Sequence, residues 1–166
     1  MKNVLILSIV LGCLGHGVAA PEGDGRRFTM QPIGTVQKKE GTTTVVIAPE
    51  FAEGLLHLDR YSHLWVIWWF DRNDNPDDRD VLRVIPRGND ANGVAGVFAT
   101  RSQFRPNLVA MTLCRIKKID GNRIELDGID AWDDTPVIDL KPYIPAIDRA
   151  EDVRTADWKA PGKKAE

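Results

Sequence analysis

The stretch Gly96–Thr112, GVFATRSQFRPNLVAMT, places two arginines four residues apart in a polar loop between apolar segments. The guanidinium groups of Arg101 and Arg105 are suited to binding a carboxylate through charge-assisted hydrogen bonds. Pro106 fixes its own φ angle and favours an extended conformation at Arg105, which stiffens the loop. We therefore predict a rigid binding loop held between strands. The alternative is a solvated connection whose arginines pair with acidic neighbours.

Strand-like patterns on both sides must position this loop. Val97–Ala99 is predicted to be a strand that enters the loop, and the alternating run Leu108–Ile119 a strand that leaves it. Further strands are predicted over residues 29–37, 42–47, 62–70, 81–85, 123–126 and 136–144. No helix of core length is found, only a short helical turn within Leu55–Tyr61. About seven short strands separated by turns indicate an all-β barrel or sandwich.

The run Ser62–Phe70, SHLWVIWWF, is the densest apolar segment of the chain. Apolar residues fall on both of its faces, which predicts a central strand buried on both sides. His63 lies at the start of this strand and is either a structural histidine or a ligand-facing one. Cys114 falls in the alternating run of a later strand and is predicted to pack as a small hydrophobic residue.

Composition and missing motifs exclude several classes of function. The 166 residues are 43% hydrophobic and 28% charged with a net charge of −2, as in a soluble single-domain protein. A nucleic-acid partner would therefore need a local basic patch. The chain contains no GxGxxG, P-loop, GxSxG or HExxH motif, which argues against a Rossmann-type enzyme. His57 and His63 lack the partners of a zinc site, so no metal is expected.

The first twenty residues have the layout of a secretory signal peptide: a short basic start, the apolar run Val4–Leu14 and then small residues. The run is too short to span a bilayer, so we expect export to the periplasm or medium and no transmembrane span in the mature chain. Residues 1–20 would be removed, leaving 21–28 as a polar tether. Alternatively, the sequence VLGC resembles a bacterial lipobox and would make Cys13 the lipidated first residue of a lipoprotein.

Five blocks in order resemble the TsaA-like family, the TrmO-type tRNA adenine-N6 methyltransferases. They are PIGTV (32–36), the PEF…EGL segment (49–55), YSHLWVIWWF (61–70), GVFATRSQFRPN (96–107) and DAWDDTPVIDLKPYIP (130–145). The resemblance implies one TsaA-like β-barrel domain with short helical turns over residues 29–158, followed by a tail over 159–166. It also implies S-adenosylmethionine as cofactor, the exocyclic amine of threonylcarbamoyl-adenosine in tRNA as acceptor, and a homodimer.

The same resemblance supplies candidate site residues by position. For the cofactor it implies Pro49, Glu50, Phe51, Ser62, His63, Leu64, Arg101, Met111, Asp133, Asp134, Thr135 and Pro136. For the substrate it implies Arg105, Asn107, Lys141 and Tyr143. Asp133 is the candidate catalytic residue, as an acceptor of the amine proton. We further expect Arg101 and Asp133 to line one pocket.

Some residues depart from the family pattern. Asp134 stands where the family has a glycine, which could close the pocket because glycine allows positive φ and close approach of a ligand. The arginine loop lacks two of the family's prolines and a glycine. The export signal also conflicts with a cytoplasmic cofactor and tRNA. The alternative function is therefore an exported, catalytically inactive TsaA-like binding module that keeps a small-ligand pocket.

Overall fold

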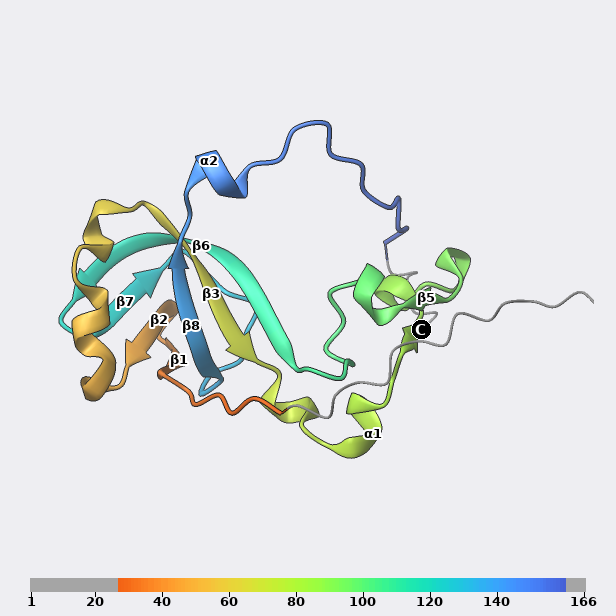
Figure 1. Ribbon diagram of the computed structural model, residues 1–166, viewed down its shortest axis with the longest axis horizontal. Coiled ribbons are helices and arrows are strands. Elements are labelled where there is room, and N and C mark those ends of the chain that lie inside the picture. Colours follow the sequence, from red (N-terminus) through yellow and green to blue (C-terminus); the bar gives the residue numbers. More distant parts are fainter. Residues whose placement is uncertain (1–26, 161–166) are drawn as a thin grey trace, which may run out of the picture.

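Six antiparallel strands close into a barrel in a computed structural model that describes residues 27–160 (Figure 1). Around the barrel they follow the order β1 (Gly34–Lys39), β2 (Thr42–Ile47), β7 (Arg123–Leu126), β6 (Val109–Asp120), β3 (His63–Trp69) and β8 (Pro136–Pro142), which returns to β1. The predicted all-β barrel is therefore confirmed.

Tight turns and β-branched residues explain why these segments pair. The run TTTVVI forms β2 with the predicted bounds, since β-branched side chains pack well on a pleated surface. Glu40 and Gly41 join β1 to β2 with φ angles of 49° and 75°, the left-handed conformation that suits a two-residue hairpin. The turn from β6 into β7 also has two residues, but only Gly121, with a φ of 59°, is left-handed. β1 begins at Gly34, later than predicted, because Pro32 lies before the first strand pair.

β3 is the strand that connects the two ends of the barrel. It pairs with β6 on one side and β8 on the other, as expected of a central strand. Leu64, Val66 and Trp68 are buried inside the barrel, whereas the alternate residues are only half-buried on the outside. The prediction of burial on both faces was therefore wrong. In a barrel one face of each strand fills the interior and the other faces outward.

The barrel interior forms the core. Its fully buried side chains include Val36, Val45, Ile47, Leu64, Val66, Ile124, Leu126 and Val137. Cys114 lies among them with 1% of its surface exposed, which confirms its prediction as a small core residue. Burial, with smaller contributions from Asp127 and Asp130, raises the pKa of its thiol to about 12. This cysteine therefore stays protonated and is no nucleophile.

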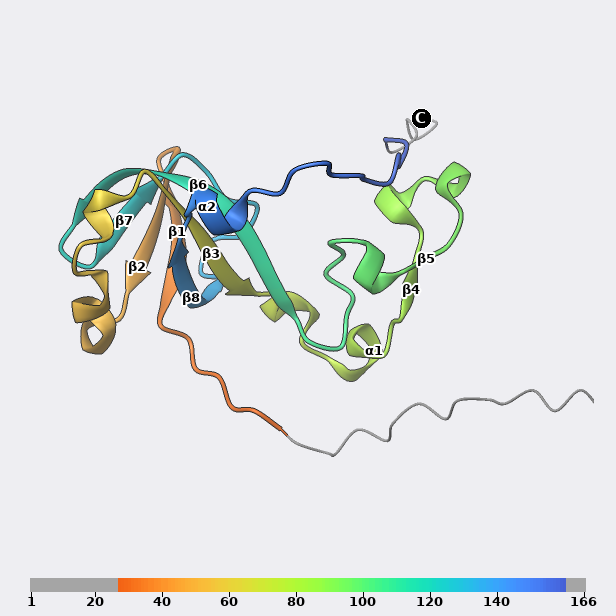
Figure 2. The ribbon, with the colours of Figure 1, turned by 45° about the horizontal axis from the view of Figure 1, so that its top comes forward.

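Residues 71–108, the side lobe, leave the barrel after β3 and return at β6 (Figures 1 and 2). The lobe contains short helices at Asp71–Asn73, Pro76–Arg79 (α1), Pro86–Gly88, Asp90–Asn92 and Val97–Ala99, and the two-residue strands β4 (Arg83–Val84) and β5 (Ala95–Gly96). The predicted strand 81–85 is thus reduced to β4, which pairs only with β5.

The predicted strand Val97–Ala99 is instead a 3-10 turn. Val97 is buried in the lobe, but Phe98 is 81% exposed. The Val97 carbonyl oxygen accepts hydrogen bonds from the amide and the hydroxyl of Thr100, which close the turn. Three apolar residues were too few to distinguish a strand from a turn.

Short helices also lie at the barrel's other edge. They span Pro49–Leu55, Leu58–Arg60 and Pro145–Asp148 (α2), which confirms short helical structure near the predicted turn 55–61. After α2 the chain runs back over open space to the side lobe (Figure 2). There Asn92 binds the backbone of Lys159 twice, accepting from its N–H at 2.8 Å and donating to its carbonyl oxygen at 3.0 Å. Trp158 is half-buried next to Lys159 and lines a cavity together with residues of the side lobe.

The predicted signal peptide 1–20, the lipobox cysteine Cys13, most of the tether 21–28 and the end of the tail 161–166 lie outside the described residues. Within residues 27–160, none of the helices has the length and apolar character needed to cross a membrane.

Candidate functional site

The arginine loop, residues 101–107, is organised by Arg105. Its guanidinium donates to the carbonyl oxygens of Ser102 at 2.8 Å, Thr100 at 2.9 Å and Val97 at 3.3 Å. These bonds connect three backbone carbonyls of the segment 97–102 to one side chain. Arg105 pairs with backbone and not with acidic neighbours, so the solvated alternative does not describe it. The guanidinium of Arg105 therefore stabilises the conformation of the loop.

A second arginine, from helix α1, also binds the backbone of the arginine loop. Arg79 donates to the carbonyl oxygen of Pro106 at 2.9 Å, forms an ion pair with Asp74 at 2.9 Å, and lies over the Trp69 ring. Hydrogen bonds from the Trp69 indole and from Arg79 hold the pKa of Asp74 below its ordinary value. The end of β3 and the arginine loop are thereby joined through side chains.

A cavity of about 300 Å³, the barrel-mouth cavity, opens where β3 ends and β6 begins. It is lined by Ile67, Trp68, Phe70, Arg101, Arg105, Val109, Ala110, Met111 and Asp130. Trp68 and Phe70 stack edge to face, with ring centroids 4.7 Å apart. Arg101 and Met111, two of the predicted cofactor residues, therefore come together on an apolar and aromatic surface.

Asp130 is the carboxylate of this cavity, and sequence reasoning did not select it. The indole N–H of Trp68 donates to Thr112 Oγ1 at 3.1 Å, and the Thr112 hydroxyl donates to Asp130 Oδ1 at 2.5 Å. Thr112 shares the interior face of β6 with Ala110 and Cys114. A hydroxyl on an otherwise apolar interior face was the signal that could have pointed to a partner such as Asp130.

Asp133 lies three residues after Asp130 in the sequence, but its carboxylate binds the backbone of β1. Its Oδ1 accepts the backbone N–H of Lys38 at 2.7 Å, while the Lys38 ammonium donates to the Ile129 carbonyl oxygen at 2.8 Å. Asp133 is absent from the lining that contains Arg101. This cavity therefore does not support the expectation that Arg101 and Asp133 share one pocket, and Asp130 is the carboxylate that lines it.

The predicted residues fall into two groups at opposite ends of β3. The turn Asp133–Pro136 leads into β8 at the same end as the barrel-mouth cavity, because Trp68 near the end of β3 pairs with Val137. Pro49, Glu50, Phe51, Ser62, His63, Leu64, Lys141 and Tyr143 lie at the other end. A strand of seven residues separates the groups by roughly 20 Å. Asn107 is exposed in the arginine loop.

The group at the other end adjoins its own cavity of about 550 Å³, the opposite cavity. Glu50, Phe51, His57 and Asp139 contribute to its lining. His63 does not face it. Its Nδ1 makes a 2.8 Å hydrogen bond with the Ser62 hydroxyl, and its ring lies 6.5 Å from that of Tyr143.

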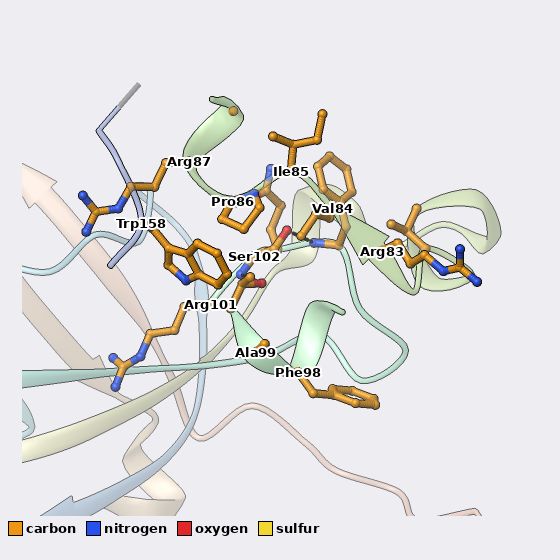
Figure 3. A pocket seen from close by; sticks show the side chains of 15 residues that line it. Arg83, Val84, Ile85, Pro86, Arg87, Phe98, Ala99, Arg101, Ser102 and Trp158 are labelled. Carbon is orange, nitrogen blue, oxygen red and sulfur yellow. Dashed lines mark hydrogen bonds between the residues drawn. The ribbon is translucent and has the colours of Figure 1, made fainter. Parts of the chain in front are cut away.

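A third cavity, the lobe cavity, measures about 1200 Å³ and lies between the side lobe and the tail (Figure 3). Its lining includes Arg83, Arg87 and Arg101 together with the aromatic side chains of Phe98, Phe104 and Trp158. Trp158 lies beside Pro86 and Ser102, while the Arg101 side chain extends away from Phe98. Because Arg101 also lines the barrel-mouth cavity, it stands between the two.

Within residues 27–160, no three histidine, cysteine or acidic side chains are grouped as a metal site would require. The candidate site at the barrel mouth consists of aromatic surfaces, the carboxylate of Asp130 and two arginines, of which Arg105 is already bonded to backbone carbonyls. Such a set suits an organic ligand that carries charges of both signs.

Asp134, the residue at the family's glycine position, has a φ of 65°. Left-handed backbone costs most residues energy, although aspartate tolerates it better than alanine does. We predict that Asp134→Ala lowers the free energy of unfolding and that Asp134→Gly does not, a difference of about 1 kcal/mol between the variants. Urea denaturation measures both. Equal stability of the two would contradict the assigned backbone conformation.

Ligand affinity is a separate matter, because Asp134 is exposed and lines none of the three cavities described above. Its side chain does not crowd the barrel-mouth cavity, contrary to what its substitution for glycine suggested.

Comparisons with known proteins agree on one relationship. The family model for the tRNA-methyltransferase O N-terminal domain matches residues 26–149. A probable S-adenosyl-L-methionine-binding protein of Methanocaldococcus jannaschii is 41% identical over 121 residues, 73% of this chain and 96% of that protein. The tRNA (adenine(37)-N6)-methyltransferase of Homo sapiens is 39% identical over 99 residues, 60% of this chain but only 22% of that enzyme.

Among solved structures, the crystal structure of TrmO from Pseudomonas aeruginosa superposes with a TM-score of 0.64 at 28% identity. The match covers 84% of this chain and 65% of the bacterial one. The chain thus spans nearly the whole archaeal relative but less than two thirds of the bacterial structure.

Proposed function

This chain belongs to the family of tRNA-methyltransferase O N-terminal domains, and we propose that it is an S-adenosylmethionine-dependent methyltransferase whose cofactor binds in the barrel-mouth cavity. The observation that carries the proposal is that Arg101 and Asp130 both line one cavity with an aromatic wall. S-adenosylmethionine carries a carboxylate, a sulfonium and an adenine ring. A guanidinium, a carboxylate and the rings of Trp68 and Phe70 are the groups that complement them.

The cofactor, when bound, supplies an activated methyl group, and the residues of the chain hold and orient the two reactants. Arg105 and Arg79 contribute indirectly, because they fix the loop that carries Arg101. The remaining candidates at that end, Thr135 and Pro136, shape the turn behind the barrel-mouth cavity.

The proposed acceptor is an exocyclic adenine amine in tRNA, the substrate type named for the human relative. The lobe cavity supports a nucleic-acid substrate, since arginines beside exposed aromatic rings are typical of proteins that bind single-stranded nucleic acid. Arg101 borders both cavities and so lies between the cofactor and the proposed acceptor.

A calorimetric titration of the protein with S-adenosylmethionine tests the proposal. We expect saturable binding with one cofactor per chain, followed by transfer of labelled methyl groups to total tRNA. If no heat of binding is seen at millimolar cofactor concentration, the methyltransferase assignment is wrong.

The second candidate is an exported binding module that keeps the ligand pocket without catalysis. The apolar run Val4–Leu14 favours it, because a signal peptide would carry the protein away from tRNA. Mass spectrometry of the protein from its native host tests export: a new N-terminus between Cys13 and Glu22 supports it, and an intact Met1 on cytoplasmic protein refutes it. Cofactor binding without methyl transfer to tRNA would favour the module.

We also propose that the protein forms a homodimer through the side lobe. The lobe exposes Leu82, Val94 and Phe98 by 58%, 68% and 81% of their surfaces, which leaves apolar area available to a second copy of the chain. Light scattering of the purified protein distinguishes dimer from monomer.

A further inference from the structure

We propose that Asp130, positioned by Thr112, is the residue whose carboxylate faces the positively charged sulfonium at the reacting end of the cofactor. This inference rests on the proposed function and assigns a role within the same cavity. It replaces Asp133, which the resemblance implied.

The first support is a chain of hydrogen bonds whose direction is fixed. The indole of Trp68 can only donate, so Thr112 Oγ1 is the acceptor at 3.1 Å. The hydroxyl proton of Thr112 is then free to be donated to Asp130 Oδ1, at 2.5 Å. The Thr112 hydroxyl thereby fixes the orientation of the Asp130 carboxylate. Trp68 is 4% exposed, so this series of hydrogen bonds begins at a side chain buried in the core.

The second support is what these bonds leave available. Asp130 uses only Oδ1, and Oδ2 has no hydrogen-bond partner among residues 27–160. Asp133 differs because its Oδ1 caps the backbone of β1 at Lys38 and it is absent from this cavity. Asp130 is therefore the carboxylate that the barrel-mouth cavity offers to a positive ligand group.

The third support is the distribution of positive charge around the cavity. Arg105 lines it, but its guanidinium binds the carbonyl oxygens of Val97, Thr100 and Ser102. Arg101 remains to bind the carboxylate of the cofactor. The carboxylate of the ligand then faces the Arg101 guanidinium, and its sulfonium faces the carboxylate of the cavity. The wall of the cavity between them includes Trp68, Phe70 and Met111.

Three ligands that differ at a single centre test the assignment by calorimetry. S-adenosylmethionine carries a positive sulfonium, S-adenosylhomocysteine a neutral thioether, and sinefungin an amine-bearing carbon in place of the sulfur. All three share the adenosine and the amino-acid groups. The variants are Asp130→Asn and the control Asp127→Asn, an exposed aspartate of the same loop that binds the Arg115 N–H outside the cavity.

We expect Asp130→Asn to lower the affinity for the two ligands with a positive centre by about tenfold. The affinity for S-adenosylhomocysteine should be nearly unchanged. The expected loss is that of one charge–charge contact, which water screens because Asp130 is exposed at the cavity mouth. Asp127→Asn should bind all three ligands as the unaltered protein does.

Other outcomes overturn the inference in distinguishable ways. An equal loss for all three ligands would place Asp130 against a group that they share, such as the α-amine or the ribose. Unchanged affinities would place it outside the site. If the unaltered protein binds none of the three, the proposed function itself fails, and this inference fails with it.

Thr112 gives an independent check of the positioning role. Thr112→Val removes the hydroxyl that holds Asp130, so it should reduce the preference for charged ligands, whereas Thr112→Ser keeps the hydroxyl and should restore it. Circular dichroism of each variant verifies the fold. A valine variant that is folded and retains the full charge preference would show that Thr112 does not position Asp130.

Discussion

Replacing Arg101 with alanine is expected to weaken the binding of S-adenosylmethionine by about tenfold to a hundredfold. Arg101 is the guanidinium of the barrel-mouth cavity that is not tied to the backbone of its own loop, so it is the group left to bind the ligand carboxylate. The loss corresponds to one charge-assisted hydrogen-bonded contact. Calorimetric titration of the variant against the unaltered protein measures it directly.

Arg115→Ala is the matched control for this substitution. Arg115 is an exposed arginine of β6 and lines none of the three cavities, so its removal changes the net charge equally and should leave the affinity unchanged. Arg101→Lys should recover only part of the affinity, because an ammonium lacks the planar pair of donors. Equal effects of Arg101→Ala and Arg115→Ala would mean that only the overall charge of the protein matters.

Replacing Gly34 with alanine is expected to lower the free energy of unfolding by about 2–3 kcal/mol. A methyl group on Gly34 would overlap the carbonyl oxygen of Val46 and lie 3.0 Å from the Cα of Ile47. Both atoms belong to the backbone of β2, so they cannot rotate away. Gly34 also pairs with Val137 of β8, so β1 is held from both sides where the barrel closes.

Urea denaturation followed by tryptophan fluorescence measures this loss, because Trp68 is buried in the barrel. Gly54→Ala is the control, since a methyl group there meets nothing within 4 Å, and it should change the stability by no more than about 0.5 kcal/mol. Gly34→Ala with unaltered stability would show that β1 can shift without cost, contrary to the register that closes the barrel.

Local patterns predicted those elements whose residues interact with near neighbours. The strands Thr42–Ile47 and Arg123–Leu126 have the predicted bounds, since β-branched runs between tight turns have few alternatives. Val97–Ala99 was wrong because a turn held by the Val97 carbonyl looks like a strand when only three residues are considered. The face of β3 that lines the interior could not be told from its outer face, because both carry tryptophan.

By itself the sequence determined the all-β barrel and, through the resemblance, the family and three residues of the barrel-mouth cavity, Arg101, Arg105 and Met111. Only the tertiary structure decided which carboxylate joins them. Asp130 and Thr112 are 18 residues apart, and Asp133 and Lys38 are 95 residues apart. Contacts over such separations depend on strand register and barrel closure, which no local spacing encodes. For this reason Asp130 lines a cavity whereas Asp133, three residues later, binds the backbone of β1.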